Sequence, residues 1–397
     1  MRAVDAVVVK PSETSSHSAR VTTWTVERKL AAKVQENLDR ITRSEDVRHV
    51  AIMPDVHLGK LINNGSVVAT SHLIYPQAVG SDIGCGLSAL RFQSTAEFLQ
   101  AERHAQCLIK ELYRHVPALK HRGAQVLPEK LCAKCLSDAA LLKQSRRDGA
   151  YQLGTLGCGN HFIELQKDDT ESLWLMVHSG SRAMGQIITG HHLAAASTSS
   201  TGLKHLDLRS EAGRAYFNDM EWAVQYATFN RLAMMARVVE ILEVSFKIMA
   251  DEDSYLDSPH NFARRETHFA EELIVHRKSA ISARRDEIGL IAGSMGTPSF
   301  VVRGLGAEES LLSSSHGAGR VLSRTVARTR ITGADMQRQL GRVHYDQQHL
   351  VALRDEAPAV YRDIREVMQA QRDLTRQHVR LTPVLNFKYA DNRTSRK

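Results

Sequence analysis

The sequence has no long apolar run: none of its segments approaches the roughly 18 consecutive apolar residues that a membrane-spanning helix needs. Near the amino-terminus a short apolar patch ends at Lys10 and Pro11, which is unlike the extended apolar segment of a secretory signal. These absences exclude a membrane-spanning protein and disfavour export. We therefore expect a cytoplasmic protein with no membrane partner.

Cysteine is also scarce, with five residues at irregular spacing: Cys85, Cys107, Cys132, Cys135 and Cys158. An odd number without a regular pattern is unlike the disulfide framework of small secreted domains and suits a reducing compartment. Cys132 and Cys135 form a single CxxC, but no second CxxC and no histidine pair at zinc spacing accompanies it, so we expect no metal there. The thiols remain available as ligands elsewhere.

The chain has 397 residues, of which 43% are apolar and 24% are charged, and this is enough material for a large core. It shows no repeat period and no stretch that is typical of a domain linker. Apolar residues at helical spacing predict helices over Gln35–Ile41, Arg214–Ala250 and Glu356–Val379. Short runs rich in β-branched and apolar residues predict strands at 47–53, 173–181 and 299–304. The sequence therefore predicts a mixed α/β fold in one domain over residues 1–397.

Positive charge exceeds negative charge, with 52 Lys and Arg against 44 Asp and Glu and a formal net charge of +8. Much of the arginine occurs in stretches such as SRRDG, FARRE and SRTVARTR. Such a surplus favours partners with many negative charges, although most charged runs only form solvated faces. The charge therefore permits a nucleic-acid partner without requiring one.

The sequence contains 19 histidines, and five of them stand in turns rich in Gly, Ser or Asn: His57, His161, His178, His260 and His316. One histidine in such a turn is most often a structural hydrogen-bonding residue, but five together favour ligands. The segment SDIGCG adds an acid and a thiol between glycines, and imidazole, carboxylate and thiolate are suitable ligands for a divalent transition metal. The acid and the thiol, which could share one ion or bridge two, are Asp82 and Cys85.

Two loops rich in Ser and Gly, SSSHGAGR and AGSMGTPSF, suit the binding of phosphate groups. Their backbone N–H groups and hydroxyls are donors for phosphate oxygens, and Arg320 adds a charge-assisted fork. Neither loop is a Walker A sequence, since no GK[ST] ends it. His316 lies inside the first loop, where a neutral imidazole could attack phosphorus to form a phosphoramidate, or could only hydrogen-bond a phosphate. The sequence therefore predicts a nucleotide site with both roles of His316 open.

A resemblance to a known family rests on seven segments that occur in order: MPDVHLGK, GSDIGCG, LGTLGCGNHFIEL, VHSGSR, HNFARRE, AGSMGTPSFVVRGLG and SSSHGAGRVLSRT. Together, from Met53 to about Lys388, they resemble the RtcB family of RNA-splicing ligases. The resemblance implies one large domain with a central metal- and nucleotide-binding cleft, followed by a short flexible tail at 389–397. It also implies GTP- and manganese-dependent joining of an RNA 3'-phosphate or 2',3'-cyclic phosphate to a 5'-hydroxyl through a guanylylated histidine, in RNA repair or tRNA splicing.

The resemblance also implies a role for each matching residue. His316 matches the histidine that carries GMP, and Cys85 is placed to bridge two manganese ions. The residues that match the metal ligands are Asp82, Cys85, His161, His178 and His260. The residues that match the GMP contacts are Asn160, His161, Phe162, Ile163, Glu164, His260, Asn261, Ala292, Gly293, Ser294, Met295, Ser299, His316, Gly317, Ala318, Gly319 and Lys388.

The chain departs from the family pattern in three places. Ala292 stands where many members have Pro, Ser314 stands where many have Cys, and the chain continues past Lys388, where family chains commonly finish with Lys-Gly. Basic residues near the motifs are suited to hold the phosphates of the RNA. The candidates for this role are Lys60, Arg182 and Arg320.

Two other classes of function remain open. A metal-dependent phosphoesterase or nuclease would use the same Asp, Cys and His cluster on water instead of on an RNA hydroxyl. A catalytically silent RNA-binding relative is less consistent with the sequence, because every expected ligand and His316 are present. Covalent labelling of the protein by GTP distinguishes the ligase from both.

Overall fold

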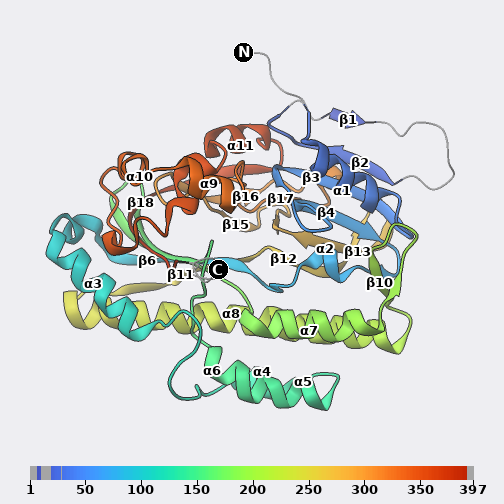
Figure 1. Cartoon of the computed structure of the whole chain (residues 1–397), viewed down its shortest axis with the longest axis horizontal. Helices are drawn as coiled ribbons and strands as arrows, with labels where there is room; N and C mark the ends of the chain where they lie inside the picture. The colour runs from blue at the N-terminus through green and yellow to red at the C-terminus, as the bar shows by residue number, and fades with distance from the viewer. Residues whose placement is uncertain (1–6, 10–18, 28, 391–397) are drawn as a thin grey trace.

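The structure is a computed structural model that describes residues 7–9, 19–27 and 29–390 (Figure 1). Two large β-sheets form its centre, and helices cover them. Among these residues, no helix has both the length and the apolar character needed to cross a membrane. The fold is mixed α/β, as the sequence predicts.

The first large sheet has six strands in the order β1-β2-β3-β4-β13-β12. Their bounds are β1 (Val7–Val9), β2 (Arg20–Thr23), β3 (Val47–His57), β4 (Asn64–Thr70), β13 (Glu271–Lys278) and β12 (Asn261–His268). The second has seven strands in the order β11-β6-β8-β7-β18-β16-β15. Their bounds are β11 (Ala250–Pro259), β6 (Gly86–Thr95), β8 (Ser172–Ser179), β7 (Phe162–Lys167), β18 (Thr375–Phe387), β16 (Ser299–Gly304) and β15 (Ile288–Ile291). Two small sheets comprise β5 (Leu73–Ile74), β10 (Lys204–Asp207) and β9 (Ser197–Thr198), and β14 (Ala280–Ser282) with β17 (Ser313–Ser315).

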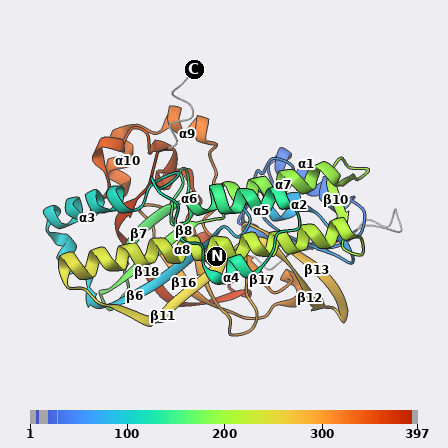
Figure 2. The ribbon, with the colours of Figure 1, turned by 90° about the horizontal axis from the view of Figure 1, so that it is seen from below.

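One long helix, α8 (Glu211–Phe246), runs beneath both large sheets (Figures 1 and 2). Ser210 caps its first turn by accepting a backbone hydrogen bond, and Lys247 ends it in the left-handed conformation. Trp222 packs in the same core cluster as side chains of the first sheet, and Met234 packs in the same core cluster as side chains of the second. The helix therefore fixes the two sheets relative to each other.

The other helices lie on the outside of the sheets. In Figure 1, a group of short helices that includes α4 and α5 lies below α7 and α8, and α9 and α10 lie above the second sheet. Their bounds are α1 (Ala32–Thr42), α2 (Pro76–Val79), α3 (Glu102–His115), α4 (Glu129–Ala133), α5 (Ala139–Gln144), α6 (Ala150–Gln152), α7 (Arg182–Ala195), α9 (Arg324–Arg330), α10 (Gly333–Leu340) and α11 (Ile364–Ala370).

The predicted helix over Glu356–Val379 is wrong for most of its length. Within this range only α11 is an α-helix. It begins after Asp363, whose side chain accepts a backbone hydrogen bond. Pro358 begins a separate 3₁₀ turn, because proline starts a turn but cannot continue a preceding helix. From Thr375 the chain is strand β18, and Val379 lies opposite Val301 of β16. The apolar residues that appeared to share one helical face thus belong to three elements.

The remaining predicted elements are confirmed. Gln35–Ile41 lies within α1, and the helix expected over Arg214–Ala250 corresponds to α8, which ends at Phe246. The strands expected at 47–53, 173–181 and 299–304 correspond to β3, β8 and β16.

The segment expected to be a flexible tail begins with Tyr389. Its hydroxyl donates to the carbonyl oxygen of Val116 at 2.9 Å, and its ring contacts the rings of Tyr113 and Phe387. Residues 391–397 lie outside the described part of the chain. Tyr389 therefore anchors the backbone directly after Lys388.

Candidate functional site

The five predicted metal ligands meet at one edge of the second large sheet. Cys85 precedes β6 directly, His178 lies near the end of β8, and His161 precedes β7 directly. Strand β8 lies antiparallel between β6 and β7. The first residues of β6 and β7 therefore lie beside the last residues of β8, at the same end of the strands. His260 follows β11, which pairs with β6 on its other side, and Asp82 stands in the turn before Cys85. The topology therefore brings together residues that are far apart in the sequence.

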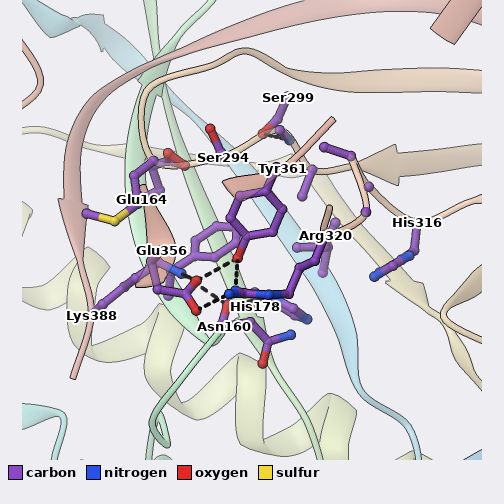
Figure 3. Close-up of a pocket in the computed structure, with 18 of the residues that line it drawn as sticks. Asn160, Glu164, His178, Ser294, Ser299, His316, Arg320, Glu356, Tyr361 and Lys388 are labelled. Carbon is purple, nitrogen blue, oxygen red and sulfur yellow. Dashed lines mark hydrogen bonds and ion pairs between the residues drawn. The ribbon is translucent and has the colours of Figure 1, made fainter. Parts of the chain in front are cut away.

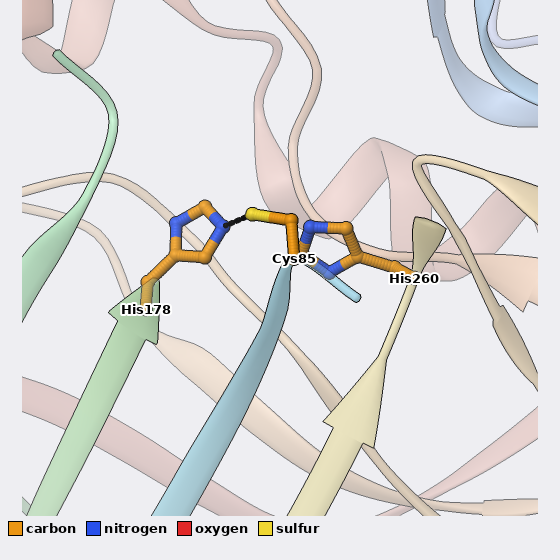
Figure 4. Close-up of side chains that lie close together, drawn as sticks. All are labelled: Cys85, His178 and His260. Atoms are coloured by element: carbon orange, nitrogen blue, oxygen red, sulfur yellow. Dashed lines mark hydrogen bonds between the residues drawn. The ribbon is translucent and has the colours of Figure 1, made fainter. Parts of the chain in front are cut away.

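The thiol of Cys85 is shared by two groups of ligand atoms. Its Sγ lies 3.3 Å from Nε2 of His178 and 3.5 Å from Nε2 of His161. One group holds Cys85, His178 and His260, as Figure 4 shows, and the ligand atoms lie within 4.8 Å of one another. The other holds Asp82, Cys85 and His161 under the same limit. A thiol that belongs to both groups is suited to bridge two metal ions.

Backbone carbonyls set the tautomers of two of these histidines. Nδ1 of His161 lies 2.9 Å from the carbonyl oxygen of Leu156, and Nδ1 of His178 lies 3.1 Å from that of Asn160. A carbonyl only accepts hydrogen bonds, so each Nδ1 carries the proton and each Nε2 keeps its lone pair. Both lone pairs face Cys85, which is the arrangement that metal-binding histidines adopt.

The charge states of the cluster also suit a cation. Burial lowers the pKa of His178 and of His260 well below the usual value, which keeps both rings neutral and able to bind a cation. Burial together with the Asp82 carboxylate raises the pKa of the Cys85 thiol, so a bound cation has to displace the thiol proton. Among the described residues, Oδ1 of Asp82 and Nδ1 of His260 are buried without a hydrogen-bond partner. Lone pairs of carboxylate, thiol and imidazole groups thus face one another in a buried space. The residues fit a site for divalent transition metals.

A buried arginine of α8 holds the turns that carry these ligands. The side chain of Arg231 has no exposed surface, and its Nη1 donates to the carbonyl oxygens of Gly84 at 2.8 Å and Ser179 at 3.0 Å. Its Nε and Nη2 donate to the carboxylate of Asp257, each at 2.9 Å. One guanidinium therefore links the turn before Cys85 to the end of β8.

His316 lies beside this cluster and is oriented by an acid that the sequence analysis did not identify. Its Nδ1 lies 2.6 Å from Oδ2 of Asp55, and its ring centroid lies 4.7 Å from that of His260. The same oxygen accepts the backbone N–H groups of His316 and Gly317. Gly319 has φ 71°, and a Cβ there would collide with the backbone oxygen of Asp55. The carboxylate thus holds the proton on Nδ1, and Nε2 keeps a free lone pair.

The signal for Asp55 was present in the sequence. It stands in MPDVHLGK, where the sequence analysis singled out His57 and Lys60 but not the acid. The ring of His57 is engaged at both nitrogens, with Nδ1 2.9 Å from the carbonyl oxygen of Asp55 and Nε2 3.1 Å from Nδ2 of Asn64. His57 is therefore a wall residue of the site, and the acid two positions earlier is the group that contacts His316.

A cavity of about 270 Å³ opens beside His316 (Figure 3). Most of the residues predicted to contact GMP line it. They are Asn160, Phe162, Glu164, His260, Ala292, Gly293, Ser294, Met295, Ser299, His316, Gly317, Ala318, Gly319 and Lys388. His178 of the predicted metal ligands lines it as well.

Three residues predicted to contact GMP do not line the cavity. Ile163 faces the opposite side of β7 and packs in a core with Leu165. The Asn261 amide donates to the carbonyl oxygen of Asp82 at 3.0 Å and accepts the backbone N–H of Ser279 at 2.9 Å, so it supports the ligand turn. His161 faces Cys85 instead.

Several lining residues were absent from the prediction. Arg324 lies in the segment SSSHGAGRVLSRT but was noted only for its charge, while Glu356 and Tyr361 fall in the segment wrongly expected to be a helix. Nothing in their local sequence marks the last two as parts of a site. The residues missed are Asn64, Leu87, Arg324, Glu356, Tyr361 and Asn386, and His57 was expected as a ligand rather than as a wall residue.

Glu164 and Lys388 stand at one end of the cavity, and His316 stands at the other (Figure 3). Burial raises the pKa of Glu164 to about 8, although the nearby Lys388 opposes the shift. Oε1 of Glu164 is buried and has no partner among the described residues. Nζ of Lys388 lies 5.3 Å from the centroid of the Phe162 ring. This end therefore offers an unsatisfied carboxyl group to a ligand.

Glu356 organises the basic groups along the cavity wall. Its carboxylate accepts hydrogen bonds from Lys388 at 2.8 Å, Arg324 at 2.6 Å and Tyr361 at 2.7 Å. Burial alone would raise the pKa of Glu356, but Lys388, Arg324 and Arg320 lower it to about 2. Glu356 is therefore ionised, and its carboxylate holds the side chains of Lys388, Arg324 and Arg320 in place.

The residues expected to position RNA phosphates lie in different surroundings. Arg320 lines the cavity, and Nη1 of Arg182 lies 3.4 Å from Nδ1 of His161, so both are close to the site. Lys60 is exposed and does not line the cavity. Cys132 and Cys135 are both exposed, and neither takes part in the two ligand groups.

Comparison with known proteins gives a consistent result over most of the chain. The family model described as "tRNA-splicing ligase RtcB" matches residues 37–389. The Escherichia coli K12 protein named RNA-splicing ligase RtcB is 36% identical over 91% of this chain and 95% of its own length. A second Escherichia coli protein, RNA-splicing ligase RtcB2, is 30% identical over 86% of this chain, and tRNA-splicing ligase RtcB of Thermococcus kodakarensis is 28% identical over 81%.

Proposed function

The chain belongs to the RtcB family of RNA-splicing ligases, and we propose that it joins an RNA 3'-phosphate or 2',3'-cyclic phosphate to a 5'-hydroxyl, using GTP and Mn²⁺, in RNA repair or tRNA splicing. The observation that carries the proposal is the place of His316. Its imidazole is oriented by Asp55, lines the cavity and lies beside the ligand cluster. A nucleophile between a polar cavity and a metal-binding cluster suits nucleotidyl transfer.

His316 supplies the lone pair for the first step. Nε2 attacks the α-phosphorus of GTP, an N–P bond forms, and pyrophosphate leaves. The ring gains positive charge as the bond forms, and the Asp55 carboxylate stabilises that charge through the proton on Nδ1. An oxygen of the RNA 3'-phosphate then takes the GMP group, which returns the lone pair to Nε2.

The second half of the reaction needs no nucleophile from the chain. The RNA 5'-hydroxyl attacks the activated 3'-phosphate, a phosphodiester forms, and GMP leaves. A 2',3'-cyclic end is first opened by water to a 3'-phosphate. The chain's part in this half is to hold the two RNA ends in line, and we assign Arg182 and Arg320 to the RNA phosphates because both lie close to the site.

The ligand cluster would hold the metal ions of the reaction. In this proposal Asp82, Cys85, His161, His178 and His260 would hold two Mn²⁺ ions. When bound, the ions neutralise phosphate oxygens and the leaving pyrophosphate. The neutral imidazoles contribute lone pairs without adding charge, so the negative ligands Asp82 and Cys85 set the net charge of the centre.

The guanine base is assigned to the end of the cavity that Glu164 and Lys388 form. Figure 3 draws Glu164 and His316 at opposite ends of the cavity, which supports the proposal of a base site at the first end and a phosphate site at the second. Guanine presents its N1–H and exocyclic amino group as donors on one edge, and a carboxylate can accept both. Adenine lacks this pair of donors, so Glu164 would select GTP over ATP.

Incubation with GTP labelled at the α-phosphate tests the proposed function directly. A covalent label on the protein that survives alkali and is released by acid is expected, because a phosphoramidate has this stability. GTP labelled at the γ-phosphate is the control and should leave no label. RNA turnover without any labelled protein would instead support the phosphoesterase alternative.

Glu164→Gln is expected to raise the KM for GTP by roughly 10- to 100-fold, because one amide group cannot accept both guanine donors and a charged hydrogen bond is lost. The parent protein should also bind GTP more tightly as the pH rises towards 8. Its carboxyl group has a pKa of about 8, so the proton must leave before both oxygens can accept. Titration of GTP binding across neutral pH measures both effects.

Asn160→Ala provides the control, since Asn160 lines the same cavity, has no titratable group in its side chain and lies away from Glu164 (Figure 3). Its GTP affinity should keep the pH dependence of the parent, whereas Glu164→Gln should lose it. Parallel pH profiles for the parent and Glu164→Gln would contradict the assignment of Glu164 to the base.

A further inference from the structure

A second concave surface lies on the outside of the second sheet, where residues of α11, β16 and β18 line it. Its volume is about 530 Å³, and no acidic residue lines it. Phe300, Leu305 and Met368 contribute its apolar part. Its polar residues, which with these three define the α11–β18 groove, are Arg365, Gln369, Arg372, Thr375, Arg376 and Gln377.

The positive charge of the α11–β18 groove is compensated only in part: Arg365 forms an ion pair with Asp363 at 2.8 Å, whereas Arg376 has no such partner among the described residues. Arg376 of β18 lies directly opposite Arg303 of β16, and like charges in this position destabilise a sheet. Arg303 reaches a carboxylate only at 3.8 Å, in Asp286. Within residues 19–27 and 29–390, Arg376 and the exposed Arg380 form no hydrogen bond or ion pair through their side chains. The strands thus retain a repulsive arrangement that an anionic partner would relieve.

The α11–β18 groove has a fixed position relative to the catalytic cavity. Ser299 lines the cavity and Phe300, the next residue of β16, lines the groove. Phe300 packs in one core with Ala318 of the cavity wall and Val367 of α11. From Ser299 to Arg303 the strand advances about 13 Å at about 3.3 Å per residue. Because successive side chains of a strand face opposite sides of the sheet, the groove lies on the face opposite Ser299, and an RNA has to pass round the sheet beyond the cavity mouth to reach it.

We propose that the α11–β18 groove binds the phosphate backbone of the RNA substrate away from the ends that are joined. This inference rests on the proposed function, which makes RNA the substrate. Arginine forks match phosphate oxygens in pairs, and contacts of this kind position a nucleic acid without reading its sequence. The groove would therefore raise the affinity for long RNA and leave the chemistry at His316 unchanged.

The double variant Arg365→Ala/Arg376→Ala tests the proposal by fluorescence anisotropy with an unreactive RNA long enough to reach the groove. We expect about tenfold weaker binding. We also expect the slope of log affinity against log salt concentration to become shallower by about 1.4, since each lost single-strand phosphate contact removes about 0.7 from this slope. Arg365→Lys/Arg376→Lys keeps the charge and should bind within a few-fold of the parent. Both side chains are exposed, so neither pair of substitutions should disturb folding.

Arg209→Ala/Arg237→Ala is the matched control, because it removes two exposed arginines and the same net charge at α8 and the turn before it. It should bind RNA like the parent. Equal weakening by the control, or unchanged binding by Arg365→Ala/Arg376→Ala, would overturn the proposal.

A comparison of substrates separates this proposal from the function on which it rests. Joining of RNA ends of only a few nucleotides, and labelling by GTP without RNA, should be the same in Arg365→Ala/Arg376→Ala as in the parent. Loss of either in that variant would overturn the proposal, since it would place the two arginines in the chemistry. A parent protein that takes up no label from GTP would contradict the proposed function, and the anisotropy comparison would still decide whether the groove binds RNA.

Discussion

His316→Ala is expected to take up no label from GTP and to lose joining of 3'-phosphate ends by at least about 10³-fold, because removal of a nucleophile leaves only binding and positioning. The cavity and the ligand cluster should remain, since His316 fills only one side of them. The variant should therefore seal an RNA whose 3'-phosphate already carries GMP. That displacement needs aligned RNA ends and the metal centre but no histidine nucleophile.

Cys85→Ala should fail on the same pre-activated RNA. Cys85 belongs to both groups of ligand atoms, so its loss is expected to lower the content of bound Mn²⁺ as well as labelling and sealing. Metal content is measured on the purified protein and does not depend on activity. Cys107→Ala is the control, because that thiol is exposed and lies outside the cluster.

The decisive comparison is the sealing of pre-activated RNA by folded His316→Ala and Cys85→Ala proteins. Sealing by the first and not by the second is the expected result. If the two behave alike, the separate assignment of nucleophile and metal ligand is wrong.

Asp55→Asn is expected to slow labelling by GTP about 100-fold, while sealing of pre-activated RNA stays within a few-fold of the parent. The backbone N–H groups of His316 and Gly317 both point at Oδ2, so they should hold the oxygen of the new amide in that place. The tautomer of His316 is then preserved. What is lost is the negative charge that stabilises the ring as the N–P bond forms.

The rate of labelling in a single turnover measures this effect without RNA. Pre-activated RNA is the internal control, since its sealing bypasses His316. Labelling at the parental rate would show that the carboxylate does not act through His316. An equal loss of labelling and sealing would show that Asp55 supports the whole site.

The turns of the sequence nominated more ligands than the structure brings together, since His57 and His316 stand in similar turns but lie outside the two ligand groups. The resemblance to the family, not the turn context, selected the five residues that meet. The alternation of a strand explains one error in the nucleotide site. Phe162 and Glu164 face the cavity, and Ile163 between them must face the other way. The resemblance to the family covers Asn160–Glu164 without a gap. It therefore does not reveal that successive side chains of the strand face opposite sides of the sheet.

Other parts of the site depend on contacts that no local pattern records. Glu356 and Tyr361 reach the cavity through a segment with helical periodicity that is divided by Pro358, so their place follows from tertiary packing. Asp55 is different, because it lies in a motif that was already in view. Its role depends on the tertiary fold, which brings Asp55 of β3 into contact with His316.

Through Arg231, the geometry of the ligand cluster depends on the sequence of helix α8. The guanidinium of Arg231 contacts two carbonyl groups and a carboxylate at once, a pattern of planar donors that lysine does not reproduce. Loss of one partner of a buried ion pair costs about 3–5 kcal/mol, which is a large share of the 5–15 kcal/mol that stabilises a typical domain. Substitutions in α8 at residues that do not contact the substrate can therefore appear in a genetic screen as catalytic defects. The sequence of this helix can change during evolution only where the turns of the ligand cluster keep their support.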